Sequence, residues 1–336
     1  MDLALILAGA VRLATPLGLA ALGEAIVERS GTINLGIEGT MLAGALAGAY
    51  GAAQAGWAAG VALAVAVGAG LGLVTAVAIL WGGANQFVVG LSLTLAAVGA
   101  STYLYELWLP SGTPPPEIPL APTVDVPLLS DIPLVGAALF EQSVFTYVML
   151  VLAAATWWGL RRTGAGLAVR AVGDDPERAG LRGVPVRLVR TAALVVAGAL
   201  AALGGSVLTV GYLGTFDENI TAGRGYVALA AVIIGRWSPW GALAGAGVFA
   251  LFDSLAIQAQ SEGIDVVPIE ILVALPYLVT LVALVAGGPG RPGPRPPGRG
   301  VGPGRPTGTP PRGGRGGLGG ETEAGRQPGQ AQADRQ

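Results

Sequence analysis

The chain has 336 residues, a formal net charge of −2 and a mean hydropathy of +0.64. Hydrophobic residues make up 52% of it and charged residues 12%, whereas a soluble domain carries roughly twice that charge. Apolar runs of about 20 residues match the hydrocarbon thickness of a bilayer. The composition therefore excludes an ordinary soluble protein and predicts an all-α, polytopic membrane helix bundle.

Nine apolar runs of near-spanning length follow one another along the chain. They cover residues 3–27, 38–54, 57–81, 86–107, 143–160, 190–211, 223–237, 241–259 and 266–287. Two of them, 38–54 and 223–237, are short for full crossings, which favours partly re-entrant segments. We expect a bundle of about 8–10 spans in a membrane domain over 1–287, with a broken or re-entrant helix near residues 30–40.

Three residue types are missing, and their absence narrows the chemistry. Cysteine and histidine are absent, and all 19 basic residues are arginine. The chain therefore lacks thiolate and imidazole metal ligands and the usual general base. Without lysine it cannot form a standard P-loop ATPase site or a Schiff base. No two carboxylates lie three or four residues apart within one apolar run, which disfavours an intramembrane hydrolase. We expect no enzyme activity, no metal site and no cofactor in this chain.

The charges predict how the chain is oriented. The segment 106–141 carries five carboxylates and no arginine, whereas 161–190 carries seven arginines. Arginine-rich short loops stay in the cytoplasm, so we expect 161–190 inside and 106–141 outside. Counting crossings from these loops places the N-terminus outside and the C-terminus inside. The Gly-, Pro- and Arg-rich segment 288–336 is expected to be a disordered cytoplasmic tail.

A short helix is predicted within the arginine-rich loop. Asp175 can cap free amides, Pro176 fits the first helical position, and Glu177 favours the positive end of the helix. Gly183 is a stop signal. A loop helix from Pro176 to Arg182 is either a docking element for a cytoplasmic partner or an amphipathic helix lying on lipid. Its acidic residues disfavour an anionic membrane and so favour docking.

Several polar residues fall within or beside the apolar runs. Asn34 and Glu38 sit among glycines that loosen the helix, so we expect a break there, with both side chains either satisfying backbone amides or contacting substrate. Asn85 and Ser92 share a helical face in the fourth run, where they either contact substrate or bond to another helix. We include Gln86, Thr94 and Phe216 with them as candidates for a substrate path.

Four stretches resemble one family of membrane proteins. They are PLGLAALGEAIVERSGTINLGIEGTMLAGA, ANQFVVGLSLTLAAVGAS, AVRAVGDDPERAGLRGVPVRLVR and GTFDENITAGRGYVALAAVIIGRWSPWGALAGAGVFALFDSL. They are similar to the permeases of bacterial ABC importers of the branched-chain amino acid, ribose and nucleoside group, and look closest to the nucleoside subgroup. The resemblance covers most of residues 10–260 in the family's order.

The resemblance implies a set of partners. These are a second permease subunit (a copy or a paralogue), two ATP-binding subunits that hold ATP and magnesium, and an extracytoplasmic solute-binding protein, all at the bacterial cell membrane and without nucleic acid. By similarity a coupling helix lies at 175–183 in the cytoplasmic coupling loop 161–190, and the residues implied are Gly173, Asp174, Asp175, Pro176, Glu177, Arg178, Gly180 and Gly183. The alternative is a self-contained ion-coupled secondary transporter or channel that uses Glu38 and Asp253.

Overall fold

A computed structural model describes residues 3–110, 113–114, 116–125, 136 and 140–262. Its helices are α1 (Leu3–Arg29), α2 (Ile37–Ala55), α3 (Trp57–Ala76), α4 (Gln86–Trp108), α6 (Val144–Arg162), α7 (Gly164–Asp174), α8 (Pro176–Leu181), α9 (Val186–Ser206), α10 (Arg224–Ile234) and α11 (Pro239–Ser261). Two π-helical segments extend α3 and α9, namely η1 (Val77–Trp81) and η2 (Val207–Leu213). The predicted all-α bundle is confirmed. The expected span 266–287 and the expected tail 288–336 lie outside the described residues.

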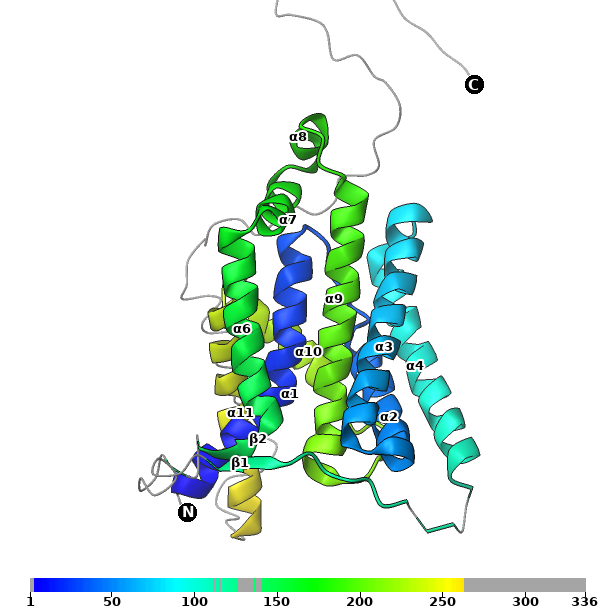
Figure 1. Ribbon diagram of the computed structural model, residues 1–336, viewed down its shortest axis with the longest axis vertical. Coiled ribbons are helices and arrows are strands. Elements are labelled where there is room, and N and C mark those ends of the chain that lie inside the picture. The colour runs from blue at the N-terminus through cyan, green and yellow to red at the C-terminus, as the bar shows by residue number, and fades with distance from the viewer. Residues whose placement is uncertain (1–2, 111–112, 115, 126–135, 137–139, 263–336) are drawn as a thin grey trace, which may run out of the picture. The chain divides into compact units, whose positions relative to one another are not determined.

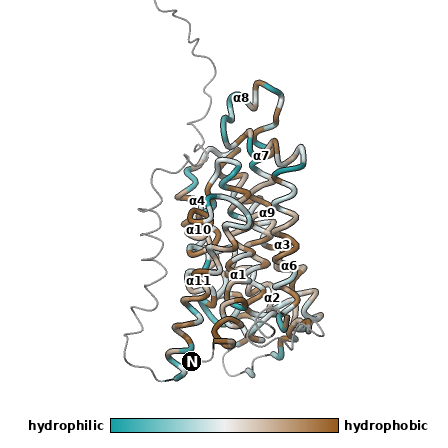
Figure 2. The backbone as a smooth tube through the Cα atoms, turned by 90° about the vertical axis from the view of Figure 1, so that its left-hand side faces the viewer, coloured by the Kyte–Doolittle hydropathy of each residue, from teal (hydrophilic) through white to brown (hydrophobic). Residues whose placement is uncertain are grey.

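The two ends of the bundle differ in character. Strands β1 (Thr123–Asp125) and β2 (Glu141–Ser143) form a small antiparallel hairpin at one end, where α1 also begins (Figure 1). Helices α7 and α8 lie at the opposite end, where hydrophilic residues gather around α8 (Figure 2). We call these the hairpin end and the arginine-rich end. The described parts of the acidic segment 106–141 thus lie at the opposite end from the arginine-rich loop, as the charges predicted.

Six described helical segments are long and apolar enough to cross a membrane. They are Leu3–Arg29, Trp57–Trp81, Gln86–Trp108, Val144–Arg162, Val186–Leu213 and Pro239–Ser261. The two runs that were short in the sequence form α2, with 19 residues, and α10, with 11. Each follows an irregular segment and begins inside the bundle, and for that reason we call both half-helices, although α2 has nearly spanning length. The re-entrant break expected near residues 30–40 corresponds to the irregular segment between α1 and α2.

The helices form two halves that run in opposite directions. Helix α1 runs from the hairpin end to the arginine-rich end, and α9 runs back (Figure 1). An irregular segment and a half-helix follow each of them, and α3 then packs along α9 as α11 packs along α1. A buried apolar cluster that includes Leu17, Met41 and Phe249 joins α1, α2 and α11. Inverted halves with discontinuous helices are typical of transporters.

Candidate functional site

The half-helices α2 and α10 meet at their N-termini. The Glu38 carboxylate, on the second residue of α2, accepts hydrogen bonds from the Gly223 amide at 2.9 Å and the Gly225 amide at 2.6 Å. It also accepts one from the Thr221 hydroxyl at 2.6 Å. Gly225 permits this approach, because a Cβ there would lie 2.6 Å from the Glu38 Cα. The two backbones are therefore in direct contact at this point, which we call the half-helix junction.

Glu38 neutralises the positive end of α10. A helix N-terminus leaves amides without intrahelical partners and carries about half a positive charge. The Glu38 side chain is only 5% exposed, and each charge-assisted hydrogen bond to it contributes about 1.5–3 kcal/mol. At 1.5 Å per residue, the junction lies about 16 Å from the far end of α10 and about 28 Å from the far end of α2. Glu38, Thr221 and Gly225 are all buried, so the junction lies inside the bundle.

Asn34 organises the break between α1 and α2. The Asn34 side-chain oxygen accepts a hydrogen bond from the Gly36 backbone amide at 3.2 Å, and the Asn34 backbone amide donates one to the Glu24 carboxylate at 2.9 Å. One of the two alternatives predicted from the sequence was that Asn34 and Glu38 both accept hydrogen bonds from backbone amides at this break. Asn34 does so, whereas Glu38 serves amides at the start of α10.

A buried carboxylate pair corrects one expectation. The first apolar run ends at residue 27, so no pair at helical spacing was expected within a span. Helix α1 continues to Arg29 and places Glu24 and Glu28 four residues apart on one face, both buried. Glu28 accepts a hydrogen bond from the Trp237 indole, and the Arg29 guanidinium donates to the Trp237 carbonyl at 2.6 Å. Both contacts hold the turn between α10 and α11 against the end of α1.

The predicted loop helix is present as α8. The Asp175 side chain accepts a hydrogen bond from the Arg178 amide at 3.0 Å, and Pro176 occupies the first turn. Asp175 also forms an ion pair with Arg178 at 3.1 Å. Gly183, with φ of +84°, follows the helix. Asp174 and Glu177 flank the cap, and Gly180 lies inside α8 with little packed against it. The cap and stop were predicted correctly.

Gly173 joins this loop to the membrane helices. It lies in the last turn of α7, directly against the carbonyl group of Arg29 at the end of α1. A Cβ at Gly173 would clash with that backbone oxygen. The loop therefore contacts Arg29, the residue whose guanidinium also donates a hydrogen bond to the Trp237 carbonyl.

Among the other candidate residues for a substrate path, Thr94 lies beside the junction, because a Cβ at Gly39 would be 2.7 Å from the Thr94 Cα. Asn85 is exposed and caps α4 by accepting the Phe87 amide at 2.9 Å. The Gln86 side-chain oxygen lies 3.4 Å from the Ile33 amide. Ser92 is exposed, whereas Thr94 is buried. Phe216 is buried and its ring lies 5.0 Å from that of Tyr105. Asn85 and Ser92 are thus both exposed, whereas Glu38 is buried.

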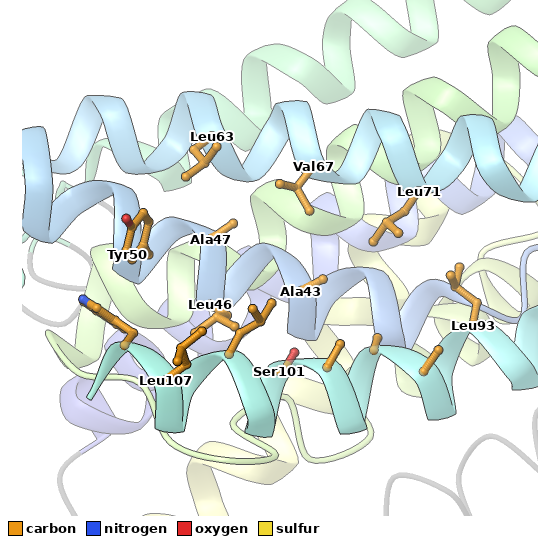
Figure 3. Close-up of a pocket in the computed structure, with 15 residues that line it drawn as sticks. Ala43, Leu46, Ala47, Tyr50, Leu63, Val67, Leu71, Leu93, Ser101 and Leu107 are labelled. Atoms are coloured by element: carbon orange, nitrogen blue, oxygen red, sulfur yellow. The ribbon is translucent and has the colours of Figure 1, made fainter. Parts of the chain in front are cut away.

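Two cavities differ in chemistry. An apolar groove of about 760 Å³ lies between α2, α3 and α4 (Figure 3). Its wall is built mainly of leucine and alanine side chains, with Ser101 and Tyr50 among the few polar ones. A second cavity of about 550 Å³ lies between α1, η2, α11 and the hairpin. We call it the polar cavity, because Arg12, Glu141 and Arg224 line it.

Several of these residues were not predicted from the sequence. Arg12 is the single charged residue between residues 3 and 23, and an ionisable residue inside a span is itself a functional signal. Arg224 lies at the edge of the short run 223–237, where a charged residue is not unusual. Glu24 is likewise an ionisable residue within the first apolar run. Their partners, however, come from other helices and were invisible in the sequence.

Inverted halves, broken helices that meet inside the bundle and a polar cavity define a multi-pass membrane transport protein. A family model described as "Branched-chain amino acid transport system / permease component" matches residues 6–284. The chain belongs to this family and is a permease component of an ABC transporter. The resemblance seen in the sequence is thereby confirmed, and permease components are not themselves the enzymes of these systems.

Three named relatives are similar to the chain over most of their length. A nucleoside ABC transporter permease of Lactococcus lactis is 32% identical, over 84% of this chain and 92% of the relative. A guanosine ABC transporter permease of Bacillus subtilis is 33% identical, over 81% and 88%. A putative glucose ABC transporter permease of Haloferax volcanii is 34% identical, over 82% and 88%. No solved structure matches the chain.

Proposed function

We propose that the chain is the permease subunit of an ATP-driven importer of nucleosides. It would act with a second permease, two ATP-binding subunits that hold ATP and magnesium, and an extracytoplasmic solute-binding protein. The observation that carries the substrate assignment is the similarity to nucleoside and guanosine permeases over more than four fifths of the chain. Because sugar permeases are also among the relatives, a sugar is the second candidate for the transported solute.

The half-helix junction supports an uncharged substrate. In transporters with discontinuous helices, the positive N-termini of half-helices commonly face an anionic group of the substrate. Here the Glu38 carboxylate already occupies the N-terminus of α10. A second negative charge beside Glu38 would be repelled, whereas a neutral nucleoside would not. The same engagement of Glu38 speaks against the alternative in which it carries a transported ion.

Helix α8 supports the coupling role. Leu181 is 89% exposed and the Arg178 side chain 82% exposed, at the tip of the arginine-rich end. An exposed leucine on a capped helix, next to charged side chains, suits docking into a groove on a protein partner. Gly173 to Gly183 would then transmit closure of the ATP-binding subunits to α1 through the contact between Gly173 and Arg29.

The orientation of the chain follows from the same assignment. The arginine-rich end would face the cytoplasm and the hairpin end the outside, with the C-terminus inside. The solute-binding protein would then approach the hairpin end.

Uptake in a reconstituted complex tests the function. The chain is purified with its ATP-binding and solute-binding partners, and uptake of labelled nucleosides, glucose and branched-chain amino acids is compared. We expect nucleosides to be transported and to compete with one another. Uptake of branched-chain amino acids alone would overturn the nucleoside assignment.

A further inference from the structure

The polar cavity reaches from the hairpin end toward the half-helix junction. Thr123, Glu141 and Ser143 of the hairpin line one part of it. Ile220, four residues before the start of α10, and Arg224, its first residue, line another. The cavity therefore connects the end that we expect to face outside with the segment that Glu38 holds. Its volume of about 550 Å³ lies within the usual range of small-molecule sites, about 300–1,000 Å³.

The lining offers both donors and acceptors of hydrogen bonds. Arg12 and Gln258 can donate, Glu141 can accept, and Ser143 can do either. The Ser143 hydroxyl is buried and has no hydrogen-bond partner among the described residues. Tyr212 adds an aromatic ring, and leucine side chains complete the wall. A solute with several hydroxyl groups and an apolar face matches this mixture.

The charges around the cavity nearly balance. Arg12 and Arg224 contribute two positive charges, and Glu141 contributes a negative one. Asp253 lies close enough to Arg224 to interact with it electrostatically. The Arg224 guanidinium is further engaged with the carbonyl oxygens of Ile220 and Thr221, at 3.0 and 3.4 Å. The cavity therefore has little surplus positive charge to attract a phosphate group.

We infer that the polar cavity binds the transported solute within this subunit, and that the solute is a neutral polyhydroxylated molecule such as a nucleoside. The inference rests on the proposed function and places its substrate. Arg12 is the residue of the cavity assigned to the solute's hydroxyl groups, because it lines the cavity beside Tyr212 and its guanidinium makes no hydrogen bond or ion pair with the residues that the structure describes.

Thiol labelling tests the inference, because the natural chain contains no cysteine. Ser143→Cys places a thiol in the polar cavity, and Ser101→Cys places a matched thiol in the apolar groove, since both serines are 4% exposed. Each variant is reconstituted with all partners and treated with a charged, membrane-impermeant methanethiosulfonate. A thiol reacts as its thiolate, so we expect Ser143→Cys to react at least ~10 times faster than Ser101→Cys.

Slower labelling in the presence of a ligand shows which class of solute occupies the polar cavity. A nucleoside should slow the labelling of Ser143→Cys, and the corresponding nucleoside monophosphate should not. Labelling that no nucleoside slows, in a complex that transports nucleosides, would overturn the inference while leaving the function intact. Protection by the monophosphate alone would overturn the neutral class. If a sugar is transported and slows the labelling of Ser143→Cys, whereas nucleosides are not transported, the cavity is still the solute site but the nucleoside assignment is wrong. Gln258→Cys replaces Ser143→Cys if that variant does not assemble.

Kinetics of Arg12 variants provide a second readout. Arg12→Ala should raise the KM for uptake about tenfold, because a charged hydrogen bond to the solute is lost. Arg12→Lys should recover part of that loss. A purely structural Arg12 would instead lower the amount of assembled complex without changing its KM, which would contradict the assignment.

Discussion

The Gly225 amide donates to the Glu38 carboxylate at 2.6 Å, and this contact joins the starts of two half-helices that lie far apart in the sequence. The hydrogen bonds from Thr221 and Gly223 to the same carboxylate complete the arrangement. The junction thus replaces the missing intrahelical partners of α10 with one side chain from the opposite half of the fold.

Gly225→Ala should disrupt the junction. The added Cβ would lie 2.6 Å from the Glu38 Cα and 2.7 Å from its amide nitrogen, and backbone atoms cannot move aside cheaply. We expect a loss of about 1–3 kcal/mol of stability, seen as a lower melting temperature of the purified complex, together with loss of uptake. Gly247→Ala is the matched control, because a Cβ there meets nothing within 4 Å. Equal effects of both variants would contradict the role of the junction.

Trp237→Phe should loosen the turn between α10 and α11. Arg236 and Trp237 have φ of +53° and +56°, a conformation that costs non-glycine residues of order 1–3 kcal/mol. The indole of Trp237 donates to Glu28, and its loss leaves a buried carboxylate without that partner. We expect a destabilisation of about 1–3 kcal/mol, measured by thermal unfolding in detergent. The exposed neighbour Trp240 supplies the control, and Trp240→Phe should unfold at the temperature of the parent.

Gly173→Ala should separate ATP hydrolysis from transport. A Cβ would clash with the Arg29 carbonyl and push α7 away from the end of α1. We expect the complex to assemble and hydrolyse ATP while uptake falls about tenfold or more, since a displacement of about 1 Å suffices for large losses. Gly164→Ala, in the same helix but with nothing within 4 Å, should behave like the parent. If Gly173→Ala couples ATP hydrolysis to uptake as the parent does, the contact between Gly173 and Arg29 has no role in coupling.

Charge reversal on α8 tests the docking role. Glu177→Arg combined with Arg178→Glu should uncouple ATP hydrolysis from uptake and leave membrane insertion intact, because both residues lie in the exposed loop helix. The conservative pair Glu177→Asp and Arg178→Lys preserves the charges and should retain most uptake. Unchanged uptake in the reversed variant would rule out α8 as the coupling element.

Local signals in the sequence predicted what is local in the structure. Asp175, Pro176 and Gly183 gave the bounds of α8 to within one residue, because capping depends on neighbours along the chain. The break before α2 was predicted for the same reason. The partner of Glu38 was not predictable, because the inverted arrangement of α1–α3 and α9–α11 brings Thr221 to Gly225 beside it. The burial of Glu28 was not predicted, because the apolar run 3–27 ends before helix α1 does.

ATP-driven accumulation of nucleosides in proteoliposomes tests the central claim most directly. Vesicles that contain the chain, its permease partner and the ATP-binding subunits are loaded with ATP and magnesium, and the solute-binding protein is added outside. We predict accumulation of a labelled nucleoside against its gradient, which stops when ATP or the ATP-binding subunits are omitted. Equal accumulation by the permease without any ATP-binding partner would contradict it.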